Sequence, residues 1–345
     1  MISKQKIKKL IIILIFMIIF TLSLVFYSNL NPFFINLFAE EFNIISNKDN
    51  MLVHFIDVGQ ADAAAINLPD GKVMLIDTGT KDVNTTYINY LKENVVNTKM
   101  NNRINYLVLS HADMDHVGGT MKLLKHFKVD TIYMPKIASD SDGYTEILNY
   151  VENNCKFVTL GAEFSIKTNS YVIKFFEILN STNTNDSSQV VKVTSDNKSF
   201  LFTGDISSSV ELDYIEKYGS ELDVDVLKVS HHGSNSSTCD RFLQMVSPQY
   251  AVISVGFGND CGHPTYDVLE RLKNNDVEIL RTDKKDDIIF VVGDEYKLKH
   301  LSGIYYITDM SLDYSVGVII LDTTLLILCV IIVVKKDKKK QLARQ

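Results

Sequence analysis

Five short apolar stretches of β type each lead into a glycine and a side chain that can bind a metal ion. Runs of this length, bounded by glycine, predict β-strands. Aligned strands bring their ends to one rim of a sheet, so ligands scattered between positions 77 and 263 are expected to form one site. The strand-end motifs are Asp77-Thr78-Gly79, Ser110-His111-Ala112-Asp113-Met114-Asp115-His116, Thr203-Gly204-Asp205, Ser230-His231-His232-Gly233-Ser234 and Gly262-His263-Pro264.

The most informative of these motifs follows the apolar run 104–109. It places His111, Asp113, Asp115 and His116 within six residues. Two imidazoles and two carboxylates on one short loop favour a divalent cation such as Zn²⁺ or Mn²⁺. The alternative is a solvated polar loop. The glycines at 118 and 119 are expected to let the backbone turn sharply into a helix over 121–127.

The order of these motifs resembles the metallo-β-lactamase superfamily. The finer pattern is similar to the metallo-hydrolase domain of the ComEC/Rec2 DNA-uptake proteins. It rests on His54-Phe55-Ile56-Asp57-Val58-Gly59-Gln60-Ala61-Asp62, on the aspartate at position 113, and on the motifs that begin at Ser230 and Gly262. The resemblance covers roughly residues 51–293 and implies a mixed α/β (α+β) fold, the αββα sandwich.

The sequence departs from the family pattern in three respects. Ala61 stands where the family usually has glycine. The separate histidine expected before Thr203-Gly204-Asp205 is missing, and Asn185-Asp186-Ser187-Ser188 occupies that stretch. One metal position is therefore expected to have fewer ligands. The resemblance does not extend to the channel domain of ComEC, so this chain is not expected to conduct DNA by itself.

A site with two divalent metal ions, Zn or Mn, is the working hypothesis. Metals about 3.5–4 Å apart can share one hydroxide and hold the attacking and leaving oxygens of a phosphodiester. Asp205 is expected to bridge the two ions, because a carboxylate has two oxygens. The other ligands are expected to be His111, Asp113 and His231 for one ion, and Asp115, His116 and His263 for the other.

Residues beside the metals have predicted roles in catalysis and support. Asp115, with Asp113 as the alternative, orients the attacking water, and Asp205 is catalytic as the bridge. His232 contacts substrate phosphate or protonates the leaving group; the alternative is that His231 and His232 exchange roles. Asp77 and Asp57 are expected to support the metal ligands from outside, Asp77 through hydrogen bonds to the His/Asp loop, and Gln60 and Asp62 are expected to give structural support beneath the site. The remaining histidines, His54, His126 and His300, are predicted to be ordinary surface or core residues, and Ser234 and Ser236 either contact phosphate or form a polar loop.

Both ends of the chain are predicted to cross a membrane. Residues 10–27 are uncharged and apolar, and residues 316–334 are apolar except for Asp322. Each run is long enough to span the hydrocarbon core. A cleaved signal peptide is the alternative for the first run and a buried core helix for the second. The predicted organisation is an anchor at 1–30, a hydrolase domain at 51–300, a second span at 314–335 and a basic tail at 336–345.

Lysines lie outside both apolar runs, at the extreme ends of the sequence. The positive-inside rule therefore predicts a cell-membrane protein with cytoplasmic termini and an extracytoplasmic catalytic domain. Residues 10–334 contain 25 basic and 41 acidic residues. Such an acidic body disfavours broad contact with nucleic acid, because Lys and Arg supply most non-specific affinity for phosphates.

The predicted function is a membrane-anchored phosphodiesterase or nuclease of ComEC-like type. Its expected partners are a phosphoester substrate, with DNA as one candidate, and the membrane. One alternative is a phosphoesterase acting on cell-envelope polymers or lipid head groups, like the phosphorylcholine esterases of the superfamily. Another is a non-enzymatic metal-binding membrane protein. β-Lactam hydrolysis is disfavoured by the aspartate at position 113 and by the motif that begins at Ser230.

The coarse secondary structure agrees with a layered fold. Residues 63–68 and 73–77 are expected to pair around the turn Pro69-Asp70-Gly71. An antiparallel group is expected from 172–178, 189–194 and 199–202, and a final hairpin from 278–281 and 288–292. Two sheets packed face to face with helices outside would accommodate these elements. Cys239 and Cys261 are either free thiols or a disulfide pair.

Overall fold

The structure, a computed structural model, describes residues 50–300 except for 84, 97–101, 136–141, 181–182 and 293–296. These residues belong to one compact unit, Ile44–Ser302. The apolar runs 10–27 and 316–334, predicted to be membrane spans, lie outside the described residues. Within the described part of the chain, no helix combines the length and apolarity needed to cross a bilayer.

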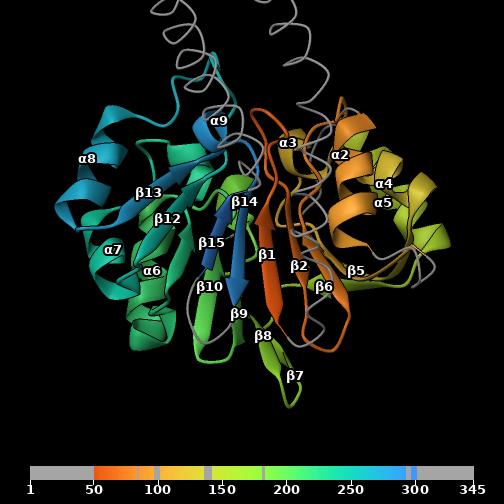
Figure 1. Ribbon diagram of the computed structural model, residues 1–345, viewed down its shortest axis with the longest axis horizontal. Coiled ribbons are helices and arrows are strands. Elements are labelled where there is room, and N and C mark those ends of the chain that lie inside the picture. The colour runs from red at the N-terminus through yellow and green to blue at the C-terminus, as the bar shows by residue number, and fades with distance from the viewer. Residues whose placement is uncertain are drawn as a thin grey trace, which may run out of the picture. The chain divides into compact units, whose positions relative to one another are not determined.

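Two β-sheets pack face to face (Figure 1). The eight-stranded sheet has the order β15-β14-β1-β2-β3-β4-β5-β6, and the seven-stranded sheet has the order β13-β12-β11-β10-β9-β8-β7. The strands of the first sheet are β1 (Met51–Phe55), β2 (Ala64–Asn67), β3 (Val73–Ile76), β4 (Arg103–Val108), β5 (Lys128–Pro135), β6 (Phe157–Leu160), β14 (Ile288–Val292) and β15 (Lys297–His300). Those of the second are β7 (Phe164–Lys167), β8 (Tyr171–Phe175), β9 (Val191–Ser195), β10 (Lys198–Phe202), β11 (Val226–Lys228), β12 (Tyr250–Ile253) and β13 (Glu278–Arg281).

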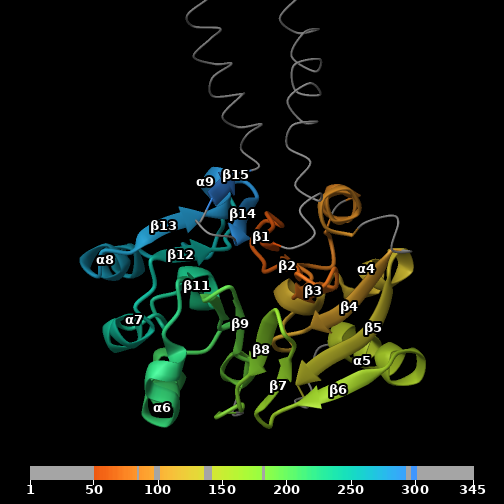
Figure 2. The ribbon, with the colours of Figure 1, turned by 60° about the horizontal axis from the view of Figure 1, so that its bottom comes forward.

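Helices cover the outer face of each sheet (Figure 2). The helical elements of the first half are α2 (Thr85–Tyr90), a π-helix (Leu91–Val95), α3 (Met114–Val117), α4 (Thr120–His126) and α5 (Asp142–Asn154). Those of the second half are α6 (Ser208–Tyr218), α7 (Asp240–Val246), α8 (Tyr266–Asn274) and α9 (Thr282–Lys285), with 3₁₀ turns at Asn185–Ser187, Gly219–Leu222 and Ser230–Gly233. The predicted two-sheet α/β sandwich is confirmed.

Alternation of side chains along each strand produces three apolar layers. In β3, Met74 and Ile76 face the core between the sheets, whereas Val73 and Leu75 face α2, α4 and α5. In β10, Phe200 faces the same central core and Leu201 faces α6 and α7. Successive side chains of a strand point to opposite faces, so a sheet covered on both faces needs apolar residues at nearly every position. This is why the strands appear in the sequence as continuous apolar runs.

Several predicted pairings are confirmed. The strands β2 and β3 pair antiparallel around residues 69–71, with Asn67 opposite Val73. The strands β8, β9 and β10 form the expected antiparallel group. The cysteines Cys155, Cys239 and Cys261 are free thiols.

The predicted final hairpin is wrong. Strand β13 pairs parallel with β12 in the seven-stranded sheet, whereas β14 pairs antiparallel with β1 in the other sheet. The charged segment between them forms α9 and carries the chain from one sheet to the other. Two adjacent β-type runs are compatible with either a hairpin or a change of sheet. Here the chain changes sheet, because Leu280 of β13 and Phe290 of β14 pack into the central core from opposite sheets.

Candidate metal centre

The strands that carry the predicted ligands end side by side within each sheet. Strands β3 and β4 pair in parallel, as do β10, β11 and β12. Their carboxyl ends therefore lie at common edges, as the sequence predicts. Contacts between the two sheets then join these edges into one cluster, because His116, after β4, lies 3.3 Å from Asp205, after β10 (Nε2 to Oδ1).

Asp77 holds the His111–His116 loop in place. Its Oδ1 accepts the backbone N–H of Ser110 at 2.7 Å, and its Oδ2 accepts the Ser110 hydroxyl at 2.7 Å. The same Oδ2 lies 2.8 Å from Nδ1 of His116. A carboxylate in this position makes Nδ1 the protonated nitrogen, which leaves Nε2 of His116 with its lone pair directed elsewhere.

Three buried side chains converge beside this loop. One ligand atom each of His111, His116 and Asp205 lie within 4.8 Å of one another, and all three residues are buried. Nε2 of His111, Nε2 of His116 and Oδ1 of Asp205 have no hydrogen-bond partner. Buried polar atoms are nearly always paired, because an unpaired one costs about 1–3 kcal/mol. Their proximity to one another indicates a cation as the missing partner.

A second group adjoins the first and shares His116. It consists of Asp115, His116 and His232, again with one ligand atom each within 4.8 Å. Nε2 of His232 lies 3.3 Å from Oδ2 of Asp115 and 3.7 Å from Oδ2 of Asp205. The two oxygens of Asp205 therefore lie near different histidines, Oδ1 near His116 and Oδ2 near His232. This arrangement suits a carboxylate between two cations.

Asp62 contacts His232 on its Nδ1 side, and Lys228 forms an ion pair with Asp62. Oδ1 of Asp62 lies 3.2 Å from Nδ1 of His232, and its Oδ2 lies 2.8 Å from the Lys228 ammonium group. Nδ1 of His232 is also 2.9 Å from the backbone oxygen of Ser254, to which it donates. Asp62 and Lys228 are 5% and 4% exposed. A third group, Asp62, Asp77 and His116, is also close enough for a cation, but both oxygens of Asp77 are already occupied by hydrogen bonds.

The two adjacent histidines both face the cluster. His231 and His232 have φ values of 51° and 52°, so they occupy the left-handed region and not a regular strand end. Their ring centroids are 6.3 Å apart. Adjacent residues of a regular strand point to opposite faces, but this turn does not have strand geometry, so both rings can face the same side. His232 is the buried member of the pair, whereas the side chain of His231 is 28% exposed and its Nε2 lies 3.8 Å from Oδ2 of Asp205.

The remaining predicted residues lie at the edge of the cluster. Asp113 is half-exposed, with Oδ2 3.7 Å from Nε2 of His111. His263 packs against His231 with ring centroids 5.7 Å apart, and its buried Nδ1 has no partner. The described hydrogen bonds of Asp57 join it to Gly59 and Asp287, and none of them reaches the histidine cluster.

Burial and charge oppose each other at the centre. Burial alone would lower the pKa of His116, but the carboxylates of Asp205 and Asp77 raise it well above its ordinary value. Burial would raise the pKa of Asp205, but His116 and His232 hold it well below the usual range. For His232 burial is again outweighed, here by Asp205 and Asp62, and its pKa rises to about 10. The carboxylates therefore favour positive charge at the histidines, and the histidines favour negative charge at Asp205.

Gly118 and Gly119 have a role different from the one predicted. Both residues are in the right-handed helical region, with φ values of −60° and −75°. They form no sharp turn. Instead, the backbone of residues 78–81 packs closely against them. A Cβ atom would lie 2.4 Å from the backbone nitrogen of Lys81 at position 118, and 2.2 Å from the backbone oxygen of Thr78 at position 119. The glycines thus allow α3 and α4 to pack directly on the loop after Asp77.

The segment that replaces the expected histidine contacts the ligands through hydroxyl groups. The backbone N–H of Asp205 donates to Oγ of Ser188 at 3.0 Å. A side-chain hydrogen bond from Thr184 helps to lower the pKa of Asp113, after the larger effect of His111. The 3₁₀ turn Asn185–Ser187 therefore lies against the cluster, and Oδ1 of Asn185 is buried there without a partner.

Sequence reasoning missed Lys228 altogether. In the sequence, Lys228 is the one polar residue of the apolar run 226–229. Its ammonium group is buried beside Asp62 only when β11 pairs with its neighbours in the sheet. Ser110 and Ser188 were likewise not singled out. A charged residue within a buried strand was the one available signal, since a lysine is almost never fully buried without a partner.

Comparison with known proteins identifies the family. The model of the metallo-β-lactamase superfamily matches residues 56–256. The chain belongs to this superfamily. Its relatives include ComE operon protein 3 of Bacillus subtilis (strain 168), 29% identical over 268 residues, which are 73% of this chain and 34% of that protein. Recombination protein 2 of Haemophilus influenzae is 32% identical over 237 residues, or 66% of this chain and 27% of that protein.

The predicted resemblance to ComEC/Rec2-type proteins is confirmed. The chain spans about a third of the length of these metallo-β-lactamase relatives. Among solved structures, the metallo-β-lactamase fold protein YhfI from Bacillus subtilis has a TM-score of 0.48 and 14% identity, over 71% of this chain and 100% of that one.

The residues at the centre fit the divalent metals typical of the superfamily. Imidazole nitrogen and carboxylate oxygen are the ligand types that Zn²⁺ and Mn²⁺ accept. The unpartnered atoms of His111, His116 and Asp205 supply these types at one place. Metal-binding histidines usually donate their other ring nitrogen to a carboxylate or a carbonyl group, as His116 does to Asp77 and His232 does to Ser254.

Proposed function

We propose that this chain is a metal-dependent phosphodiesterase that uses two divalent cations, Zn or Mn. The observation that carries the proposal is the pair of ligand groups that share His116 and adjoin Asp205. His111, Asp113 and Asp205 would hold one cation, and Asp115, His232 and Asp205 the other, with His116 close to both sets. This assignment makes His232 a metal ligand in place of His231 and puts it at the ion of Asp115, where His263 was predicted, because His232 is the buried histidine next to Asp115.

Cations held in this way would polarise phosphoryl oxygens and lower the pKa of water. The protein's own side chains contribute orientation and proton transfer. Asp77 keeps the proton of His116 on Nδ1, and the Ser254 carbonyl oxygen does the same for His232. His231 is partly exposed beside Asp205, so its imidazole is placed to donate a proton to a leaving oxygen.

We further propose a cell-membrane location, with the catalytic domain on the extracytoplasmic face and both termini in the cytoplasm. The apolar runs at 10–27 and 316–334, with lysines outside each, support this arrangement. The name of one relative, Recombination protein 2, favours a nucleic-acid phosphodiester such as DNA as the substrate.

A smaller phosphoester is the second candidate substrate. The excess of 41 acidic over 25 basic residues between positions 10 and 334 repels a long polyanion. A phosphoester on a cell-envelope polymer or a lipid head group would meet less of this repulsion. Hydrolysis rates on single-stranded DNA and on small phosphodiesters, measured across salt concentrations, would separate the two candidates.

The Asp205→Ala variant tests the proposed metal chemistry. It removes the carboxylate between the two groups, so hydrolysis of bis-p-nitrophenyl phosphate by full-length protein should fall by at least about 10³-fold, and bound metal should decrease. Asp213→Ala is the matched control, because Asp213 is exposed on α6. Full activity and unchanged metal content in Asp205→Ala would refute the proposal.

A further inference from the structure

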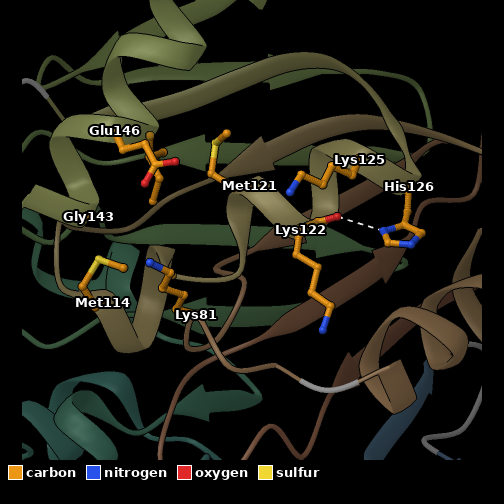
Figure 3. Close-up of a pocket in the computed structure, with 10 residues that line it drawn as sticks. Lys81, Met114, Met121, Lys122, Lys125, His126, Gly143 and Glu146 are labelled. Carbon is orange, nitrogen blue, oxygen red and sulfur yellow. Dashed lines mark hydrogen bonds between the residues drawn. The ribbon is translucent and has the colours of Figure 1, made fainter.

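A cavity of about 440 Å³ lies on the outer side of α3, away from the ligand cluster. It is lined by residues of α3, α4 and α5 and by Lys81 from the loop after β3 (Figure 3). Its volume is within the range of small-molecule sites. The side chains of Met114, Met121 and Ile147 give it apolar walls.

The charged residues of this cavity are mainly basic. Among the described residues, those that line it with a charge or an imidazole are Lys81, Lys122, Lys125, His126 and one carboxylate, that of Glu146. Within the described residues, none of the three lysines forms an ion pair, and the Lys122 ammonium group donates to the backbone oxygen of Val83. On a domain with a large acidic excess, three ammonium groups at one cavity favour an anionic ligand.

The cavity adjoins the element that carries the metal ligands. Met114 lines it and stands between Asp113 and Asp115 in the sequence, whereas Asp115 contacts His232 on the other side of α3. Gly118, at the end of the same helix, is packed so closely on Lys81 that a Cβ atom would lie 2.4 Å from the Lys81 nitrogen. A ligand in the cavity would therefore touch α3 directly.

We propose that this cavity binds an organic phosphate, with its phosphate group between Lys81 and Lys125 and its apolar part against Met114 and Met121. The phosphate can belong to a neighbouring unit of the substrate chain or to a free small molecule. The first source rests on the proposed phosphodiesterase function. Binding as such does not, because no residue of the metal centre takes part in it.

The test measures binding of phenyl phosphate to full-length protein by calorimetry. A chelator is present, so that the metal centre cannot capture the probe. Lys81→Glu and Lys125→Glu should each weaken binding about fivefold or more, since each reverses a charge facing the anion. Lys128→Glu makes the same charge change three residues farther along, on β5 and outside the cavity, and should change affinity less than twofold. Equal affinity in all three variants, or no saturable binding to the unaltered protein, would overturn the proposal.

Two kinetic measurements on metal-loaded protein distinguish the sources. If the phosphate belongs to the substrate chain, Lys125→Glu raises KM for a trinucleotide but not for bis-p-nitrophenyl phosphate. If it belongs to a free molecule, phenyl phosphate changes kcat for bis-p-nitrophenyl phosphate in the unaltered protein and not in Lys125→Glu. Absence of any hydrolysis would count against the proposed function alone, because the binding measurement is independent of it.

Discussion

His54 should make the stability of the domain fall in mild acid. It is fully buried in β1, and burial lowers its pKa from 6.5 to about 4 in spite of the hydrogen bond to Asn67. Nε2 of His54 lies 3.1 Å from Oδ1 of Asn67, whose amide is oriented by its bond to the backbone oxygen of Val95. Nε2 therefore carries the proton, and Nδ1 accepts from the Tyr90 hydroxyl at 2.8 Å. Protonating the ring would break this acceptor interaction.

The sign and size of the effect follow from linkage. Between pH 6.5 and about 4 the unfolded chain binds a proton at this position and the folded chain does not, so stability is complete above pH 6.5 and decreases as the pH falls. The lowered pKa of His54 corresponds to about 2.5 kcal/mol of unfolding free energy lost between pH 7.5 and 4.5.

Chemical denaturation at several pH values measures this contribution. The His54→Gln variant cannot ionise at this position, so its difference in unfolding free energy from the unaltered protein should shrink by about 2.5 kcal/mol between pH 7.5 and 4.5. Taking the difference cancels groups that titrate in both proteins. His126→Gln is the control for replacing a histidine by glutamine, because His126 is exposed. Parallel curves for His54→Gln and the unaltered protein would refute the reasoning.

Two further substitutions test the packing beneath the site. In Gly119→Ala the new methyl group meets the Thr78 backbone oxygen at 2.2 Å, so unfolding measurements should show a loss of about 1–3 kcal/mol, and normal stability would contradict the close-packing role. In Lys228→Met the buried carboxylate of Asp62 loses its cation, and a loss of about 3–5 kcal/mol is expected. Adding Asp62→Leu should recover most of that loss in thermal denaturation; if the double variant is no more stable than the single one, the ion pair does not explain the effect.

Local patterns in the sequence were sufficient for the layers of the fold and for the residues that gather at the rim. The motif around His111 and His116 could be recognised because its residues are neighbours along the chain. Apolar runs followed by glycine predicted where β3, β4, β10 and β11 end, and hence which side chains meet. These features depend on spacing within a few residues.

Features that depend on packing between distant segments were not predictable. Gly119 is required by the carbonyl group of Thr78, and no local pattern distinguishes such close packing from a turn. The partner of Lys228 lies 166 positions earlier in the sequence, at Asp62. The charged stretch after Arg281 resembles a hairpin turn, and only the membership of β13 and β14 in different sheets shows that it connects the sheets.

The ligand cluster is assembled from both sheets. Asp77, His111 and His116 follow strands of the eight-stranded sheet, whereas Asp205 and His232 follow strands of the seven-stranded one. An ion held among them would cross-link the two halves of the sandwich and would bind the folded chain in preference to the unfolded one. At a free concentration one hundred times its dissociation constant, such an ion adds about 2.7 kcal/mol to folding. Metal supply would then determine how much intact protein persists, besides how fast it turns over substrate.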